Sequence, residues 1–414
     1  MKHQRSILTT LACLSKWSQC DAFPVSNPPY RTMHHFAYLR QCQFARHKSV
    51  LHQTNVSFSS KNSEIHFKHE STASSVQDSL LKQVGGKLTV FNILQASILL
   101  LKHYEAPEPI ESACHLLAFA LKNEFEWKDN GFSILYNLLD GGGRGQYLKD
   151  VNLTSDEFHE YSNMIARRIN KEPLQYIIGQ WDFHNIVLKI RPPCLCPRPE
   201  TEELVEYTLS DIGQMIRALR SQNNSRKVRV LDVGCGTGAI GIAILNMFPQ
   251  DVSVVAIDVA QEAIDLSNEN KEFVLNHQDQ CHYMTCLSSA KEFDPHAMDL
   301  GGFDVVVSNP PYIPSRDMPT LSEDVLNFED YNALCGGDDG LDIVHDILSR
   351  LPQWCQSEND NGKSFRSTCW MELDSSHPSI MPLIVEKYPN ISFLQSLKDM
   401  SGLDRFVQFE VLSK

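Results

Sequence analysis

The feature that most constrains the fold is a regular alternation that begins at Lys227 and continues to the C-terminus. Short runs rich in valine and isoleucine alternate there with segments of helical periodicity. The strand-like runs are VRVLDVG, VSVVAID, FDVVVSN, TCWMELD, ISFLQSL and RFVQFEVL, and helices are expected at 238–248, 260–276, 340–350 and 378–388. This order predicts an α/β, Rossmann-like domain, a mainly parallel sheet with helices on both faces. Ligands of such sheets bind at the carboxyl ends of the strands.

The segments before this domain have a different pattern. Apolar residues recur three or four apart over 81–170, which predicts a small helical domain, with breaks at Pro107, Pro109, the run Gly141–Gly143 and a cap signal at Ser155/Asp156. Residues 171–200 contain β-type runs and predict a β-hairpin linker. The domain of residues 201–414 then opens with a helix that Thr201 is expected to cap. The polar inserts 217–227, 292–302 and 355–366 are expected to be surface loops.

The first 80 residues are polar and basic. Residues 1–78 hold nine Lys/Arg and four Asp/Glu, and since the chain has 37 and 51 in all, residues 79–414 hold 28 and 47, a net charge of −19. Such an N-terminal segment resembles an organellar presequence joined to a disordered linker, with the mitochondrial matrix as destination and a plastid as the alternative. A disordered tail without an address is the other interpretation. A first NPPY, Asn27–Tyr30, lies there without a preceding strand and is not expected to function.

Two protein classes are not expected. The longest apolar run, 88–101, is 14 residues and contains Asn92 and Gln95, so it predicts a buried helix and no membrane association. The 12 cysteines include no CxxC pair, which favours reduced thiols in a reducing compartment and no metal site.

A glycine-rich turn follows the first strand of the α/β domain. In VRVLDVGCGTGAIG, the glycines Gly234, Gly236 and Gly238 lie between a buried strand and a helix. Glycine lets the backbone take positive φ and approach a ligand closely. A dinucleotide site would have the spacing GxGxxG. Here the third glycine comes one position earlier, a spacing that resembles the S-adenosylmethionine (AdoMet) loop of class I methyltransferases.

The next strand ends in Asp258, 22 residues after Gly236. A carboxylate at that position can accept hydrogen bonds from both hydroxyls of a ribose. Both NAD and AdoMet would use such a group. The alternative role, as the N-cap of the following helix, applies to an isolated Asp.

The second NPPY, Asn309–Tyr312, directly follows the strand FDVVVS and therefore emerges at the same sheet edge as the glycine turn. Pro310 and Pro311 stiffen the turn and lack N–H donors, which leaves the Asn309 side-chain oxygen and the Pro310 carbonyl as neighbouring acceptors. Two acceptors suit a planar NH2 group and would aim its nitrogen at a methyl donor. Tyr312 would cover the planar group or line the pocket.

The three motifs predict an AdoMet-dependent methyltransferase of an NH2 group, with two kinds of target left open. One is the exocyclic amine of adenine or guanine in a nucleic acid, and the other is the side-chain amide of a protein glutamine. A nucleic-acid enzyme should show a basic face. The charge of −19 over 79–414 favours a protein substrate. A non-catalytic assembly factor that retains the AdoMet fold is a third hypothesis.

Most of residues 85–414 resemble the PrmC/HemK family, the glutamine N5-methyltransferases that modify the Gly-Gly-Gln (GGQ) motif of peptide chain release factors. The segments that carry the resemblance are EPLQYIIGQWDF (172–183), PRPETEELVE (197–206), LDVGCGTGAI (231–240), VVVSNPPYIP (305–314), NFEDYNALCGGDDGL (327–341) and DMSGLDRFV (399–407).

The resemblance implies roles for individual residues. The AdoMet loop would be Gly234, Cys235, Gly236, Thr237 and Gly238, with Asp258 on the ribose and Asn309 also near the cofactor. Asn309, Pro310, Pro311 and Tyr312 would bind the substrate glutamine, and Asn309, Pro310 and Tyr312 would be catalytic. Arg198, Glu200 and Glu202 would shape the wall of the site. The chain departs from the family at MTCLSSAKEF, so the adenine contact is expected near Leu287 or Ser288. The implied partner is an organellar release factor, with no direct nucleic-acid substrate.

Overall fold

The computed structural model describes residues 72–121, 131–139, 145–298, 300–355 and 366–412. The chain divides into two units, Met1–Phe67 and Lys68–Lys414, and all described residues belong to the second. The expected presequence, the first NPPY and nearly all of the insert 355–366 lie outside the described residues. No helix within the described part combines the length and the apolar character needed to cross a bilayer.

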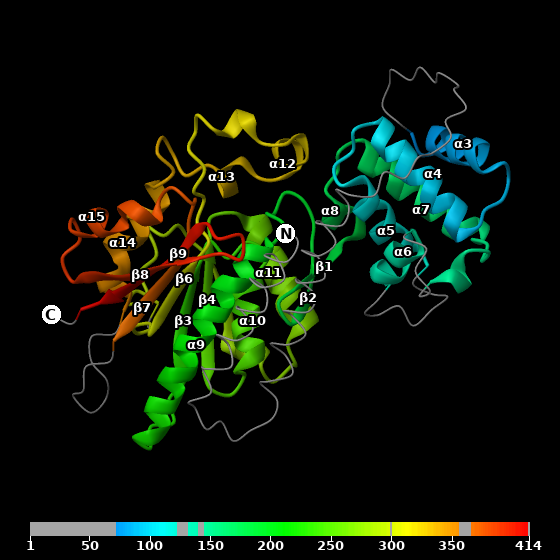
Figure 1. Ribbon diagram of the computed structural model, residues 1–414. Coiled ribbons are helices and arrows are strands. Elements are labelled where there is room, and N and C mark those ends of the chain that lie inside the picture. The colour runs from blue at the N-terminus through cyan, green and yellow to red at the C-terminus, as the bar shows by residue number, and fades with distance from the viewer. Residues whose placement is uncertain (1–71, 122–130, 140–144, 299, 356–365, 413–414) are drawn as a thin grey trace, which may run out of the picture. The chain divides into compact units, whose positions relative to one another are not determined.

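The described residues of the helical region form α3 (Ala73–Val84), α4 (Val90–His103), α5 (Pro109–Ala120), α6 (Gly131–Leu139) and α7 (Ser155–Ile169), with the short η1 (Gln146–Leu148) before α7 (Figure 1). Residues 73–80 were expected to belong to the linker, but they form the first part of α3, because Val76 and Leu80 are buried and Thr72 caps the first turn. The cap of α7 is Thr154, one residue before the expected signal, since Thr154 and Glu157 form a reciprocal capping box.

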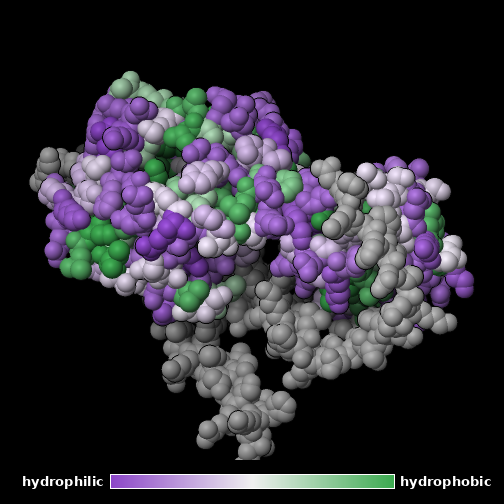
Figure 2. Space-filling view, turned by 90° about the horizontal axis from the view of Figure 1, so that it is seen from above, coloured by the Kyte–Doolittle hydropathy of each residue, from purple (hydrophilic) through white to green (hydrophobic). Residues whose placement is uncertain are grey.

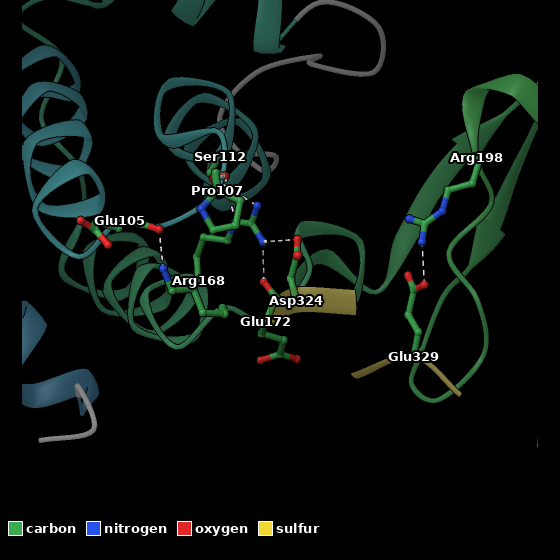
Figure 3. Close-up of polar contacts among 9 residues, drawn as sticks. Glu105, Pro107, Ser112, Arg168, Glu172, Arg198, Asp324 and Glu329 are labelled. Atoms are coloured by element: carbon green, nitrogen blue, oxygen red, sulfur yellow. Dashed lines mark hydrogen bonds and ion pairs between the residues drawn. The ribbon is translucent and has the colours of Figure 1, made fainter. Parts of the chain in front are cut away.

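One buried arginine joins several segments of this region. Arg168, near the end of α7, is 3% exposed and donates to the Ser112 hydroxyl and to the carbonyls of Pro107 and Glu172 (Figure 3). Its Nη1 also lies 4.0 Å from Oδ2 of Asp324. These contacts compensate the cost of removing a guanidinium from water.

The predicted linker contains the hairpin, but it begins with a helix. The apolar run QYII lies in α8 (Leu174–Ile178), and the hairpin is β1 (Gln180–Phe183) paired with β2 (Ile186–Lys189). Helix α9 spans Pro199–Ser221, so the predicted cap at Thr201 is wrong. Proline suits the first helical position, and Thr201 is therefore already inside the helix. The end of α9 also replaces the first part of the loop expected at 217–227.

A seven-stranded sheet forms the α/β domain, in the order β5-β4-β3-β6-β7-β9-β8. The first five strands of this order, β5, β4, β3, β6 and β7, are parallel to one another. Strand β9 is antiparallel to both of its neighbours, β7 and β8. The strands are β3 (Val228–Val233), β4 (Val252–Asp258), β5 (Tyr283–Leu287), β6 (Val305–Ser308), β7 (Ser367–Glu372), β8 (Ile391–Lys398) and β9 (Asp404–Val411). The predicted class I methyltransferase fold is confirmed.

Helices cover both faces of the sheet (Figure 1). One hydrophobic cluster joins one face to α9, α10 (Ala239–Met247) and α11 (Gln261–Val274), and a second joins the other face to α14 (Asp342–Trp354) and α15 (Met381–Val385). Strands β3 and β6 are almost entirely buried, as expected of parallel strands covered on both faces. The remaining short helices are η2 (Gln280–His282), η3 (Met318–Thr320), α12 (Glu323–Phe328), α13 (Tyr331–Leu334) and η4 (Pro378–Ile380).

Candidate active site

The predicted site residues lie at the carboxyl ends of three neighbouring parallel strands, β4, β3 and β6. Val233 of β3 pairs with Ile257 of β4 and Ser308 of β6, and Ser308 pairs with Met371 of β7. The next residue along the chain is Gly234 after Val233, Asp258 after Ile257, Asn309 after Ser308 and Glu372 after Met371. The register therefore brings the glycine turn, Asp258 and the NPPY turn together, as the sequence predicts. It also adds Glu372, which the sequence analysis did not single out.

All three glycines of the turn have left-handed backbone conformations, with φ of 71° at Gly234, 52° at Gly236 and 80° at Gly238. A Cβ at Gly238 would lie 2.6 Å from the Ser267 hydroxyl, so this glycine is required by packing. A Cβ at Gly234 or Gly236 would meet no protein atom within 4 Å. The backbone is thus open on that side for the close approach of a ligand.

The N–H groups of the turn distinguish between ligands. Gly234 and Cys235 both donate to the Ile257 carbonyl, Gly236 donates to Asp258, and Gly238 donates to the Cys235 carbonyl. A pyrophosphate needs a row of available N–H donors. Because four of these donors are already used within the protein, the turn is poorly suited to a dinucleotide.

Asp258 lies directly against the turn. Its Oδ2 accepts from the Gly236 N–H at 2.9 Å, and its Oδ1 accepts from the Ala260 N–H at 3.0 Å. Burial raises the pKa of Asp258, and these backbone donors oppose that shift. The cap residue of α11 is Ala260, so Asp258 is not the helix cap. A carboxylate oxygen has two lone pairs, so both oxygens can accept one further hydrogen bond from a ribose.

The NPPY turn lies beside a small cavity. Asn309 and Tyr312 are half-buried, and Pro310 is buried. The cavity has a volume of about 120 Å³ and is lined by Leu195, Arg198, Asn309, Pro310, Pro311, Tyr312, Ile313, Leu321, Val325, Ala333 and Leu334. Most of this lining is apolar, and the polar atoms of the NPPY turn stand out against it. Such a pocket is suited to one small polar group on a short side chain.

A chain of hydrogen bonds runs behind this turn. Asn309 Nδ2 donates to the Thr201 hydroxyl at 3.0 Å, and that hydroxyl donates to Glu372 Oε2 at 2.7 Å. The Tyr312 hydroxyl donates to Glu372 Oε1 at 3.3 Å. Burial raises the pKa of Glu372 to about 7, while the Thr201 hydrogen bond and the charge of Arg405 oppose the shift. Burial likewise raises the pKa of Tyr312.

Arg198 of the segment PRPETE holds the outer wall of the cavity. Its Nη2 pairs with Glu329 Oε2 at 2.6 Å, and the Glu329 side chain is 1% exposed (Figure 3). The pair connects the start of α9 to the segment between α12 and α13. Glu200 and Glu202 lie in the first turn of α9, where they suit the positive end of its dipole.

Two exposed apolar side chains lie next to Asp258, one directly after it in the chain and one opposite it on β5. Val259 is 64% exposed, and Leu287, which pairs with Asp258 across β4 and β5, is 52% exposed. Leu287 lies where the sequence placed the adenine contact. The exposed Val259 could have been found from its position immediately after the β4 carboxylate.

The comparisons with known proteins agree with this geometry. A family model described as methyltransferase small domain matches residues 211–326, and a model described as PrmC N-terminal domain matches residues 144–179. The MTRF1L release factor glutamine methyltransferase of Homo sapiens is 35% identical over 257 residues, which are 62% of this chain and 72% of that protein. The release factor glutamine methyltransferase of Streptococcus pneumoniae is 33% identical over 256 residues, 62% of this chain and 81% of that protein. The chain therefore belongs to the PrmC/HemK family of release factor glutamine methyltransferases.

Proposed function

We propose that this protein transfers the methyl group of AdoMet to the side-chain amide nitrogen of the glutamine in the GGQ motif of an organellar release factor. One observation carries the proposal. Asn309 and Pro310 follow β6 next to the glycine turn that follows β3. Asn309 and Pro310 also line the small cavity. A methyl donor and a glutamine amide held at these two turns would be neighbours.

The residues of the turn fit AdoMet. The open backbone of Gly234 and Gly236 would accommodate the amino acid part, Asp258 would bind the ribose, and the exposed side chains of Val259 and Leu287 would contact the adenine. Cys235, Thr237 and Gly238 support the turn from within, since all three are buried. When bound, AdoMet supplies an electrophilic methyl group on a sulfonium sulfur.

Asn309 and Pro310 orient the substrate. The Asn309 Oδ1 atom and the Pro310 carbonyl accept the two hydrogens of the glutamine NH2 group, so that its nitrogen has one fixed position. Orientation of this kind can contribute up to about 7–11 kcal/mol to catalysis. A hydroxyl in place of the amide would leave one acceptor unpaired, at a cost of about 1–3 kcal/mol.

Pro311 keeps the turn rigid, and Tyr312 closes the cavity beside the amide. No strong base is needed, because the amide proton becomes acidic only as the new bond forms, and it then leaves to water.

We further assign residues 1–71, which precede α3, to import into the mitochondrial matrix, and the helical region up to residue 170 to recognition of the release factor. Basic composition supports the first assignment, and the match of a PrmC N-terminal domain model supports the second. None of the relatives reported above points to a plastid. A fluorescent reporter fused to residues 1–71 should accumulate in mitochondria. A diffuse cytosolic signal would refute this address.

The test of the activity uses labelled AdoMet and an organellar release factor, either intact or with the GGQ glutamine changed to alanine. We expect label on the intact factor alone. Equal label on both factors, or label on RNA added as a competitor, would refute the proposed substrate.

A further inference from the structure

We propose that Thr201 and Glu372 are positioning residues that determine which way the Asn309 amide faces. The proposal rests on the function proposed above, because it concerns the acceptor that Asn309 offers to the substrate. An asparagine side chain can present either its oxygen or its NH2 group to a cavity, and the two arrangements have nearly the same shape. Only the arrangement with the oxygen toward the cavity can hold an amide NH2.

The hydrogen bonds behind the turn select one of these two arrangements. A hydroxyl has one hydrogen to donate. Thr201 donates its hydrogen to Glu372 Oε2 at 2.7 Å, so toward Asn309 it can act only as an acceptor. It therefore receives Nδ2 of Asn309, at 3.0 Å. With the nitrogen fixed on Thr201, the Asn309 oxygen is turned away from it.

Glu372 determines which group donates and which accepts in this series of hydrogen bonds. An ionised carboxylate only accepts hydrogen bonds, and Glu372 receives one hydroxyl on each oxygen, from Thr201 and from Tyr312. A neutral acid or an amide at this position could instead donate to Thr201. The Thr201 hydrogen would then point to Asn309 and attract its oxygen, which would turn the NH2 group toward the substrate.

Both residues act from outside the cavity. Thr201 is 4% exposed in the first turn of α9, Glu372 is 1% exposed at the end of β7, and neither lines the cavity beside the NPPY turn. Their effect on the reaction must therefore pass through Asn309 and Tyr312. The position of Thr201 inside α9 does not by itself indicate that Thr201 orients another side chain.

The test removes the hydroxyl without changing the shape of the side chain. Thr201→Val should lower kcat for the release factor about 10-fold, which corresponds to about 1.4 kcal/mol in the barrier. Thr201→Ser keeps the hydroxyl and should recover most of this loss. Thr208→Val is the matched control, because Thr208 is also buried in α9, but its hydroxyl donates to the Leu204 carbonyl within the helix. The control should retain the kcat of the unchanged protein, and AdoMet affinity should stay constant in all three.

A second readout reports the direction of the amide itself. A release factor whose GGQ glutamine is replaced by glutamate offers acceptors instead of an NH2 group, so it should inhibit the unchanged enzyme weakly. In Thr201→Val and in Glu372→Gln, where the Asn309 NH2 group can face the cavity, the same factor should inhibit several-fold more strongly. A purely structural role would weaken the binding of both factors alike. Stronger inhibition thus supports the proposal, and unchanged or weaker inhibition overturns it.

A double variant separates this inference from the proposed function. Once Asn309→Ala has removed the amide, adding Thr201→Val should lower kcat no further, because residues that act through one another are not additive. A further 10-fold loss in that background would overturn the positioning role. If Asn309→Ala alone leaves kcat unchanged, the proposed function fails. If Asn309→Ala lowers kcat while Thr201→Val equals the unchanged protein, only this inference fails.

Discussion

At the scale of single residues, two buried carboxyl groups near the carboxyl ends of the strands have a pKa close to neutral. Burial raises the pKa of Glu372 and that of Asp232 to about 7 each. Around Glu372, the hydroxyls of Thr201 and Tyr312 and the charge of Arg405 favour ionisation, while Glu200 opposes it. Glu372 therefore changes its charge near neutral pH, and with it the direction of the hydrogen bonds to Asn309.

This titration predicts opposite pH dependences for stability and activity. The pKa of Glu372 is higher in the folded state than its ordinary value of 4.5, so the folded protein binds the proton more tightly. Its stabilising contribution is complete below about pH 4.5 and is lost as the pH rises through about 7, a change of about 3 kcal/mol. In contrast, kcat should rise over the same range, because the ionised carboxylate orients Asn309.

Urea unfolding and steady-state kinetics between pH 5 and 8 test this prediction. In Glu372→Gln, the slope of stability should become flatter, with the part due to Asp232 remaining, and the rise in kcat should disappear. Identical profiles for the two proteins would show that Glu372 does not titrate in this range.

At the scale of elements, one side chain ties the hairpin to the glycine turn. Asn270 of α11 is fully buried, accepts from the Lys189 N–H, and donates to the carbonyls of Lys189 and Thr237. It thereby replaces a missing backbone partner for β2 and fixes the turn from behind. The hairpin thus supports the AdoMet site in addition to linking two regions of the chain.

Asn270→Leu should destabilise the protein by about 3 kcal/mol, because it leaves one buried and two partly buried backbone groups without their partner, and a buried group without a partner costs about 1–3 kcal/mol. AdoMet affinity should also fall, since the Thr237 carbonyl is no longer held. Urea unfolding and calorimetric titration measure the two effects. The control is Gln261→Ala on the exposed start of the same helix, which should stay within about 0.5 kcal/mol of the unchanged protein. An Asn270→Leu protein as stable as this control would contradict the account.

The sequence predicted the elements whose signal is local. The strands of the sheet were found because buried parallel strands form continuous runs of valine and isoleucine. The helix α8 was missed because the short apolar run QYII has no period that distinguishes a strand from a buried helix. Glu372 was missed for a different reason. Its place beside Asn309 depends on the register between β6 and β7, which are separated by some 60 residues of chain.

At the scale of the whole molecule, the described surface shows small apolar groups among mainly hydrophilic residues (Figure 2). Residues 79–414 carry a net charge of −19, which disfavours close approach to the phosphates of a nucleic acid. A protein substrate that inserts one glutamine into the cavity at the NPPY turn agrees with both features. The proposed function thus depends on a fixed pair of acceptors at one sheet edge.

Fragment-ion mass spectrometry of the release factor after incubation with AdoMet tests this claim most directly. We expect one added methyl group on the side-chain nitrogen of the GGQ glutamine, and a strongly reduced but measurable rate of this addition with Asn309→Ala protein that still binds AdoMet. Methylation at another residue, or methylation at the same rate with Asn309→Ala, would contradict this claim.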